Sequence, residues 1–403
     1  MLILIAVFTL AIFLPRFYWL MFEKPVRKPF VQYSCVKNDF MIQRIREKKW
    51  EDTKGHSYTQ EEYERNLPLM FTKQLLASGT MVDSVNGVPL KMKDIATEKS
   101  FFRLKANEVD APFSALYPMF ESMSGRAKID LPDDFFRITW RIEFIDAATN
   151  TIVEEKSQLF SAALFHFGFK FPAKRIFGIA TPRKSCDEGY LILDSNDQLF
   201  HLKMAKGKPF VKKVDLPSGL KFRHISCVDF KNKAFYAYLF STKNEIYILT
   251  QTDYKLIKWP VEGYDQATCD LKIYGDMFNY TVVIEANDHL KVVALDKDYN
   301  LDDTYSEKWL VKEDLKSGKI FASIFPFTFS MTSDNSNFVR FYFSRSNGFN
   351  WLILNILLAV FHLGWVVWQK RKIKASLIDL LIVAITGIYG FFAIQLFRNK
   401  FLD

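Results

Sequence analysis

The chain has 403 residues, of which 49% are hydrophobic and 16% aromatic, and this apolar content is enough for a folded core and excludes a disordered polypeptide. Its formal net charge is +9, but residues 1–22 carry +1 and residues 348–403 carry +4, which leaves +4 on residues 23–347. A nucleic-acid-binding domain would concentrate basic residues on that long segment, so the charge pattern argues against nucleic acid as a partner.

Residues 1–22 form an apolar run that is interrupted only by Pro15 and Arg16. No basic segment precedes the run and no pair of small residues marks a cleavage site after it, so an uncleaved transmembrane signal anchor fits better than a cleaved signal peptide. Arg16 would then extend toward the nearer membrane interface. The alternative is a buried helix of a soluble domain.

Residues 23–135 are predicted to form an extramembrane region that mixes helices and strands. Thr59 followed by Glu62 has the spacing of a capping box, and the sequence after it predicts a helix that Gly79 closes. A second helix is predicted outside this region, over residues 157–169. A linker is the alternative for residues 23–135, but the aromatic residues along them argue against it.

Residues 136–347 contain a repeat of an apolar strand, a polar turn and an alternating strand. Four hairpins follow this pattern, at residues 190–203, 236–250, 280–295 and 327–343. Their turns centre near Asp197, Asn244, Asp288 and Asn335, and turn residues of this kind between β-rich runs are typical of hairpins.

Weaker strands are predicted between the hairpins, at residues 210–216, 254–261 and 299–305. A unit of about 45 residues with up to four strands is typical of a propeller blade. The sequence therefore predicts a mainly β protein with a β-propeller-like domain over residues 136–347, to which residues 136–155 would add a blade. The alternative is a long twisted sheet or a sandwich.

The stretch CDEGYLILDSNDQLFHLK (186–203) carries the densest set of candidate chemical groups. As a calcium loop of the EF-hand type beginning at Asp194 it fails, because Leu199 stands where glycine is needed and Ala205 where glutamate is needed. We therefore expect Asp194 to accept hydrogen bonds in a turn. Asp187 and Glu188 are an adjacent acid pair, for which a solvated loop is favoured over acid–base chemistry.

The sequence contains no recognisable catalytic or cofactor-binding pattern. His201 has no other histidine within twenty residues, and the six histidines show no metal-ligand spacing. We therefore predict no catalytic residue, no metal and no cofactor, and a protein that is not an enzyme. The cysteines at positions 35, 186, 227 and 269 allow two disulfides in an extracytoplasmic domain, or buried small residues in a repeated fold.

The last 55 residues contain two apolar runs, residues 349–368 and 377–397, which predict two transmembrane helices. The loop between them, residues 369–376, is basic and carries Lys370, Arg371, Lys372 and Lys374. Short basic loops stay in the cytoplasm, which places the N-terminus and this loop in the cytoplasm and residues 23–347 in the periplasm. The reversed topology would instead use the basic residues near both chain ends.

Four residues of these predicted spans are candidates for topology or contact with a partner. An ionisable group inside a membrane indicates function by default, which draws attention to His362, although one neutral imidazole can also bond a neighbouring helix. Asp379 follows the basic loop and is expected to face Lys374 near the helix start. Thr386 and Gly390 form a small-xxx-small notch to which Gly387 adds; such notches let a partner helix approach closely, but they are common in single spans too.

Three stretches resemble a known group of proteins: PFVQYSCVKNDF (29–40), ALYPMFESMSGRAKIDLPDDFFRI (115–138) and FPAKRIFGIATPRKSCDEGYLILDSNDQLFHLK (171–203). The group is a family of about 400-residue membrane proteins of unknown function from Gram-negative anaerobic bacteria. The resemblance implies an N-terminal anchor, a large middle domain and a C-terminal helix pair, and genes that often lie beside those of ABC-transporter components. It implies no catalytic residues.

We therefore expect an inner-membrane protein that acts as an accessory or sensory and binding partner of an ABC-type transporter, through its periplasmic β domain and its C-terminal helix hairpin. The alternatives are an envelope enzyme that acts on a lipid-linked or cell-surface substrate and a structural envelope scaffold.

Overall fold

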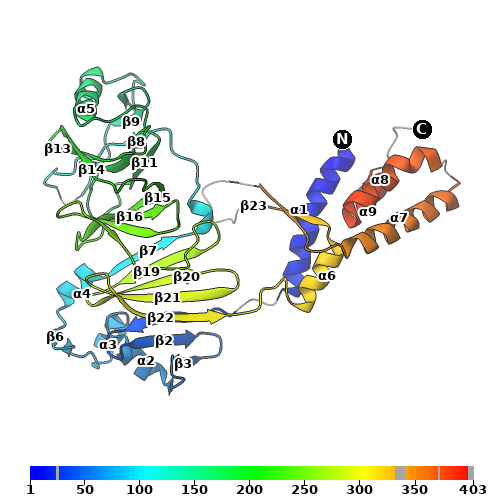
Figure 1. The fold of residues 1–403 in the computed structure, drawn as a ribbon, viewed down its shortest axis with the longest axis horizontal. Coiled ribbons are helices and arrows are strands. Elements are labelled where there is room, and N and C mark those ends of the chain that lie inside the picture. Colours follow the sequence, from blue (N-terminus) through cyan, green and yellow to red (C-terminus); the bar gives the residue numbers. More distant parts are fainter. Residues whose placement is uncertain (24–26, 127, 332–338, 340, 371–372, 398–403) are drawn as a thin grey trace. The chain divides into compact units, whose positions relative to one another are not determined.

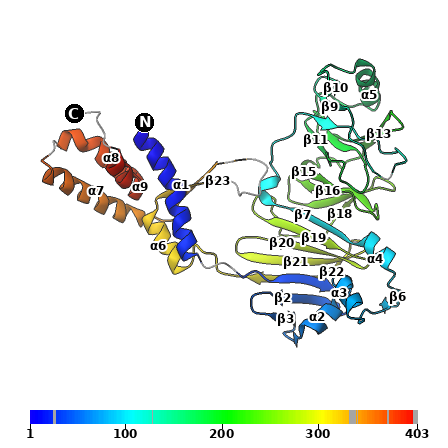
Figure 2. The ribbon, with the colours of Figure 1, turned by 180° about the vertical axis from the view of Figure 1, so that it is seen from behind.

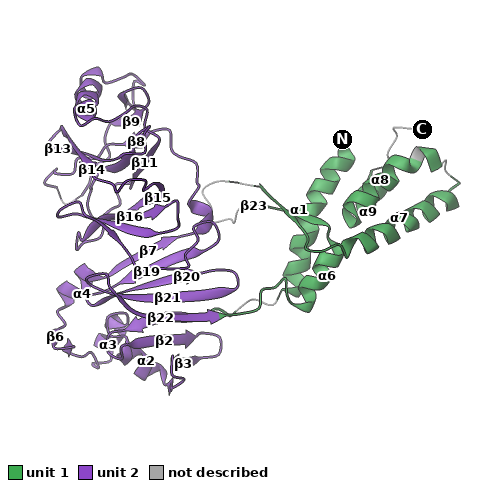
Figure 3. Ribbon diagram, viewed as in Figure 1, with its two compact units in different colours: residues 1–28, 308–403 green, residues 29–307 purple. Residues whose placement is uncertain are grey.

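A computed structural model describes the whole chain except residues 24–26, 127, 332–338, 340, 371–372 and 398–403. The chain forms two compact units (Figure 3). The β unit comprises residues 29–307, and the helical unit comprises residues 1–28 and 308–403. The predicted boundaries lie at residues 135 and 347, whereas these two units divide at residues 28 and 307.

Three four-stranded antiparallel meanders form the centre of the β unit (Figure 1). The first contains β11 (Arg175–Gly178), β12 (Tyr190–Leu193), β13 (Leu199–Ala205) and β14 (Lys208–Val214). The second contains β15 (Phe222–Cys227), β16 (Phe235–Ser241), β17 (Ile246–Thr250) and β18 (Leu256–Lys258). The third contains β19 (Asp270–Gly275), β20 (Asn279–Glu285), β21 (His289–Asp296) and β22 (Leu301–Lys308), and β7 (Ser100–Leu104) pairs with β19 at its edge.

The central strands are apolar on both faces, which is why the sheets stack. In β12, Tyr190 and Ile192 pack into a core with the preceding sheet, whereas Leu191 and Leu193 pack into a core with the β15–β18 sheet. A strand that faced water on one side would alternate apolar and polar residues. Burial on both faces therefore requires a neighbouring sheet on each side.

Two further sheets lie at the ends of the stack. One contains β1 (Phe30–Ser34), β2 (Asp39–Arg44), β3 (Lys49–Asp52) and β4 (Ser57–Tyr58). The other contains β8 (Tyr117–Pro118), β9 (Asp134–Ile138) and β10 (Ile142–Asp146). Figures 1 and 2 show these two sheets at opposite ends of the β unit, so the described sheets form an open row and not a closed ring.

The mainly β prediction is confirmed, and hairpins 190–203, 236–250 and 280–295 are the second and third strands of the three meanders. The first strand of each meander was not predicted. The β-propeller-like prediction is confirmed only in its units of up to four strands, because the described sheets form a row with two ends. The hairpin predicted at 327–343 belongs to the helical unit, and its turn at Asn335 lies outside the described residues.

Short helices join the sheets of the β unit. They are α2 (Gln60–Asn66), α3 (Thr72–Ala77), α4 (Met92–Glu98), the 3-10 turn η1 (Ala106–Glu108) and α5 (Glu154–His166), with a small hairpin of β5 (Ser84–Val85) and β6 (Val88–Pro89). Thr59 and Glu62 form the predicted capping box. The helix expected to reach Gly79 is instead two helices, because the chain leaves α2 just before Pro68, whose ring does not fit a helix interior.

The helical unit contains α1 (Leu2–Phe22), α6 (Lys316–Ile324), β23 (Phe327–Met331), β24 (Phe341–Arg345), α7 (Trp351–Trp368), the 3-10 turn η2 (Ile373–Ser376), α8 (Leu377–Thr386) and α9 (Ile388–Leu396). Among the described residues, two helices, α1 and α7, are long and apolar enough to cross a membrane. The third predicted span, residues 377–397, is not one continuous helix, because the chain breaks at Gly387.

Gly189 offers a test of how closely the β12–β13 hairpin is packed. Its φ is +70°, and an added Cβ would lie 2.3 Å from the Leu202 carbonyl oxygen. Gly207 has a similar φ of +72° and no atom within 4 Å of an added Cβ. We expect Gly207→Ala to cost about 1 kcal/mol through backbone strain, and Gly189→Ala about 2–4 kcal/mol through strain and overpacking.

The free energies of unfolding of the two variants are compared by denaturant unfolding of the full chain in detergent, with fluorescence of the β unit as the signal. Equal losses of stability for the two variants would contradict the packing seen around Gly189.

Candidate functional site

The C-terminal helix hairpin contains all the residues predicted for topology or partner contact. Lys370 follows α7 and Lys374 lies in η2, whereas Arg371 and Lys372 lie outside the described residues. His362 is buried in α7, and Asp379 is buried in the first turn of α8. The structure therefore brings the two ionisable residues into the interior of the hairpin.

The break between α8 and α9 is built on Gly387. This residue has φ +59° and ψ −126°, a backbone conformation that favours glycine. Asn355 of α7 packs directly on it, because a Cβ at position 387 would lie 2.0 Å from the Asn355 Oδ1 atom. The Asn355 Nδ2 atom donates a hydrogen bond of 3.0 Å to the carbonyl oxygen of Ala384, one of the last carbonyls of α8.

This contact explains how a broken helix is tolerated among apolar side chains. The last carbonyls of a helix have no partner in the helix, and unpaired backbone groups are costly where no water can reach them. Asn355 satisfies one such carbonyl and is itself only 1% exposed. Its Oδ1 atom has no hydrogen-bond partner in the described part of the chain, so the break retains one buried acceptor.

The small-residue notch is filled from within the hairpin. A Cβ on Gly390 would lie 2.3 Å from Thr386 Oγ1 and 2.9 Å from Ile382 Cγ2, and Gly387 is covered by Asn355. The other face of α9 packs on α1, where Ala393 meets Ala11 in one apolar cluster. Asn355 and Ile382 therefore pack against these glycines inside the chain, and the approach of a partner helix to the notch stays a prediction.

Asp379 does not make the predicted contact with Lys374. No ion pair joins these two residues in the described part of the chain, and the N-cap residue Ser376 makes no side-chain capping bond. The Asp379 Oδ1 atom has no hydrogen-bond partner among the described residues. The carboxylate still lies at the N-terminus of α8, where the helix dipole favours a negative charge.

The second candidate region surrounds the hairpin 186–203 of the β unit. His201 is 1% exposed and lies between the β11–β14 and β15–β18 sheets. Its Nε2 atom contacts the Glu188 carbonyl oxygen, an acceptor, so Nε2 carries the proton. The Nδ1 atom then accepts from the Tyr254 hydroxyl at 2.8 Å, and Tyr254 accepts from the Tyr236 hydroxyl at 3.2 Å.

Charged residues around His201 are paired with one another. Glu188 binds Lys203 at 2.9 Å and Lys233 at 3.1 Å. Burial acts to raise the pKa of Glu188, but the hydrogen bonds and charges of the two lysines outweigh it and lower the pKa. Burial lowers the pKa of His201 to about 4, so the imidazole is neutral at pH 7.

Asp187 forms a second, more deeply buried pair. Its Oδ1 atom is 2.5 Å from the Lys184 Nζ atom, and the Ser122 hydroxyl donates to its Oδ2 atom at 2.5 Å. Lys184 also donates to the Ile179 carbonyl oxygen at 2.8 Å and lies 4.0 Å from the ring centroid of Phe120. The expected solvated loop is wrong at Asp187, because its carboxylate is enclosed and paired.

The space beside His201 is small, and the thiols in its wall are protonated. The cavity beside His201 holds about 10 Å³, room for about one water molecule. Burial raises the pKa of Cys186 and raises that of Cys227 to about 12, so neither thiol in the cavity wall is a thiolate at pH 7. The four cysteines of the chain are free thiols.

The turn at Asp194 forms as predicted. Its Oδ1 atom accepts from the backbone N–H groups of Asn196 (2.8 Å) and Gln198 (2.9 Å), and its Oδ2 atom accepts from that of Lys170 (3.1 Å). The carboxylate oxygens are therefore used by the backbone. In the described part of the chain, no three histidine, cysteine or acidic residues are placed to hold a metal ion.

Sequence reasoning missed Asn355, Lys184 and Tyr254. Asn355 had a signal, since it is the one amide inside the apolar run of α7 and a glycine interrupts the next run. No sequence pattern indicated Lys184 or Tyr254. Tyr254 reaches His201 from the adjacent sheet, and Lys184 lies just before the stretch 186–203.

The stacked antiparallel sheets and the two long apolar helices of the described residues define the class: a β-sheet protein with two candidate membrane spans. The chain belongs to the family described as a domain of unknown function, DUF4857, which matches residues 30–295. This range runs from the first residue of β1 into β21 and so covers nearly the whole β unit. No curated protein matches the chain.

The buried His201 predicts a defined dependence of stability on pH. Its pKa is about 4 in the fold, against an unfolded value of about 6.5, so protonation favours the unfolded chain. The stabilisation is present above about pH 6.5 and is lost as the pH falls toward 4, by about 3 kcal/mol. His201→Gln removes this part of the pH dependence in denaturant titrations, whereas His166→Gln, at an exposed position of α5, retains it. Parallel pH curves for wild type and His201→Gln would refute the assignment.

The contact between Asn355 and Gly387 predicts a contrast between two glycines of the hairpin. Gly387→Ala adds strain at a positive φ and displaces the Asn355 amide, so we expect a loss of about 2–4 kcal/mol. Gly364→Ala in α7 meets no atom within 4 Å and should be neutral or slightly stabilising. Thermal unfolding in detergent measures both. Because Asn355→Ala removes the clash, the double variant should lose less than the sum of the single losses; strict additivity would argue against the contact.

Proposed function

We propose that this protein is a membrane-anchored accessory and binding protein that associates with another integral membrane protein, of the ABC-transporter class. In this proposal the helical unit lies in the bacterial inner membrane and the β unit lies in the periplasm. The N-terminus and the loop at residues 369–376 lie in the cytoplasm.

The main support is the position of the β23–β24 hairpin along α1. The Phe8 ring lies 4.8 Å from that of Phe329 in β23 and 6.1 Å from that of Phe341 in β24. A helix of 21 residues is about 31 Å long, close to the thickness of the hydrocarbon core. Phe8 lies about 9 Å from the start of α1, so α1 as a membrane span places the hairpin at hydrocarbon depth.

The outer strand of this hairpin requires a protein neighbour at that depth. The hairpin has two strands, and all five residues of β24 are exposed, among them Phe341 (59%) and Phe343 (61%). An exposed strand edge presents N–H and C=O groups that lipid chains cannot bond. A strand or polar side chains of a partner would supply the missing hydrogen bonds, as in strand addition.

The choice of a transporter as the partner comes from the family resemblance, in which the genes often adjoin those of ABC-transporter components. The structure is compatible with an accessory role, because the charged groups around His201 are bonded to one another and leave a cavity of only about 10 Å³. A binding surface needs no such reactive group.

The test is copurification from native membranes in mild detergent, with subunits identified by mass spectrometry. We expect transporter subunits with the wild-type chain and about tenfold less with Tyr342→Ala, which truncates an exposed aromatic of β24. Trp368→Ala is the matched control, an exposed aromatic of α7 away from the hairpin, and should retain them. Recovery of no transporter subunit with the wild-type chain would contradict the proposal.

A further inference from the structure

The helical unit contains a cavity of about 650 Å³ between α1, α6 and the β23–β24 hairpin. We propose that this cavity binds the headgroup of an anionic phospholipid. The inference goes beyond the proposed partnership with a transporter and shares with it only the placement of the helical unit in a membrane.

Among the described residues, the cavity is lined by three cationic side chains, Arg16, Lys312 and Arg345, and by one carboxylate, that of Glu313. Arg16 makes no hydrogen bond or ion pair with any residue in the described part of the chain. Arg345 contacts aromatic rings and no carboxylate there, with its guanidinium carbon 5.3 Å from the ring centroid of Phe349. Both residues are exposed, and a guanidinium group can bind phosphate oxygens in a bidentate manner.

The third cation, Lys312, already contacts neighbouring groups. The Lys312 Nζ atom lies 3.4 Å from Glu23 and 4.7 Å from the ring centroid of Trp19. Glu23 neutralises part of its charge, and Glu313 repels an anion. The two arginines therefore carry most of the attraction for a negative ligand.

The Arg16 side chain can extend along α1 toward the level of the lipid phosphates, as long basic side chains do near the end of a span. It lies six residues before Phe22, the last residue of the helix, or about 9 Å from that end. Tyr18 and Trp19 follow it, and such rings favour the headgroup region. An unpaired arginine at this depth is costly to bury, and an anionic headgroup that accompanies it would reduce that cost.

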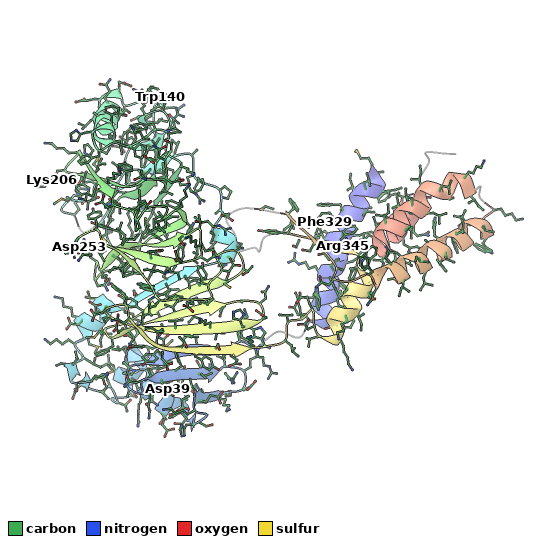
Figure 4. All side chains as sticks on the ribbon, viewed as in Figure 1. Asp39, Trp140, Lys206, Asp253, Phe329 and Arg345 are labelled. Carbon is green, nitrogen blue, oxygen red and sulfur yellow. The ribbon has the colours of Figure 1, made fainter. Side chains whose placement is uncertain are left out.

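A second, apolar groove of about 460 Å³ adjoins the cavity, and Phe329 and Arg345 line both. Leu4, Val7 and Phe8 of α1 form its wall. Figure 4 shows Phe329 and Arg345 on the hairpin beside α1. A cationic cavity that continues into an apolar groove fits a lipid, whose headgroup and acyl chain would occupy the two parts, and a free phosphate ion would leave the groove empty.

The experiment uses the full chain purified in detergent and mixed with equal amounts of phosphatidylglycerol and phosphatidylcholine, followed by native mass spectrometry. We expect the wild-type chain to retain phosphatidylglycerol preferentially. Arg16→Gln combined with Arg345→Gln should reduce that retention about tenfold or more, since each basic residue contributes to attraction of anionic lipid. The charge-preserving pair Arg16→Lys and Arg345→Lys should restore most of it.

The matched control is Lys370→Gln combined with Lys374→Gln, which removes two cations of the α7–α8 loop outside the cavity. Equal retention of the two lipids by the wild-type chain, or an equal loss in the control, would overturn the proposal. Displacement of the lipid by millimolar inorganic phosphate would also overturn it, because that result identifies a free-anion site. The assay contains no transporter, so its failure leaves the copurification result unaffected.

Discussion

The β unit depends on strands that are apolar on both faces. β16 is buried along its whole length, and β20 is buried except at its last residue. No single sheet of this kind is stable in water, because each would expose two apolar surfaces. The fold is therefore a row in which every interior sheet is covered by the next one, and stability must come from the contacts between sheets as much as from the hydrogen bonds within them.

The same constraint explains the charged cluster around His201. A loop that enters a row of closely stacked sheets carries its polar side chains into the interior, where each needs a partner. Asp187 forms an ion pair with Lys184 and accepts a hydrogen bond from Ser122. Glu188 forms ion pairs with Lys203 and Lys233. These pairs hold the start of β12 against neighbouring segments of the β unit.

The sequence predicted the parts of the fold whose signal is local. The turns at Asp197 and Asn244, both at positive φ, and the strands beside them followed from residue pattern alone. The first strand of each meander was missed because β11 and β15 are short or interrupted by polar residues, as in Arg-His-Ile-Ser of β15. The open row could not be predicted, since closure depends on the small rotation between adjacent sheets, which no residue pattern records. The hairpin at 327–343 shows the same limit, because its strands look like those of the repeat while their aromatic residues pack on α1.

The helical unit contains non-helical backbone at the break between α8 and α9 and in the β23–β24 hairpin, and the two places are stabilised differently. At Gly387 the missing hydrogen bond comes from within the chain, because Asn355 donates to the Ala384 carbonyl oxygen that the break leaves unpaired. At β24 the described residues supply no such partner, because the outer edge and the rings of Phe341 and Phe343 are exposed. Irregular backbone at membrane depth persists only where protein or a water-filled cavity covers it. If α1 spans the bilayer, the backbone groups at the edge of β24 therefore need hydrogen-bond partners from another protein. The neighbouring arginines, Arg16 and Arg345, would then be the place where an anionic lipid binds.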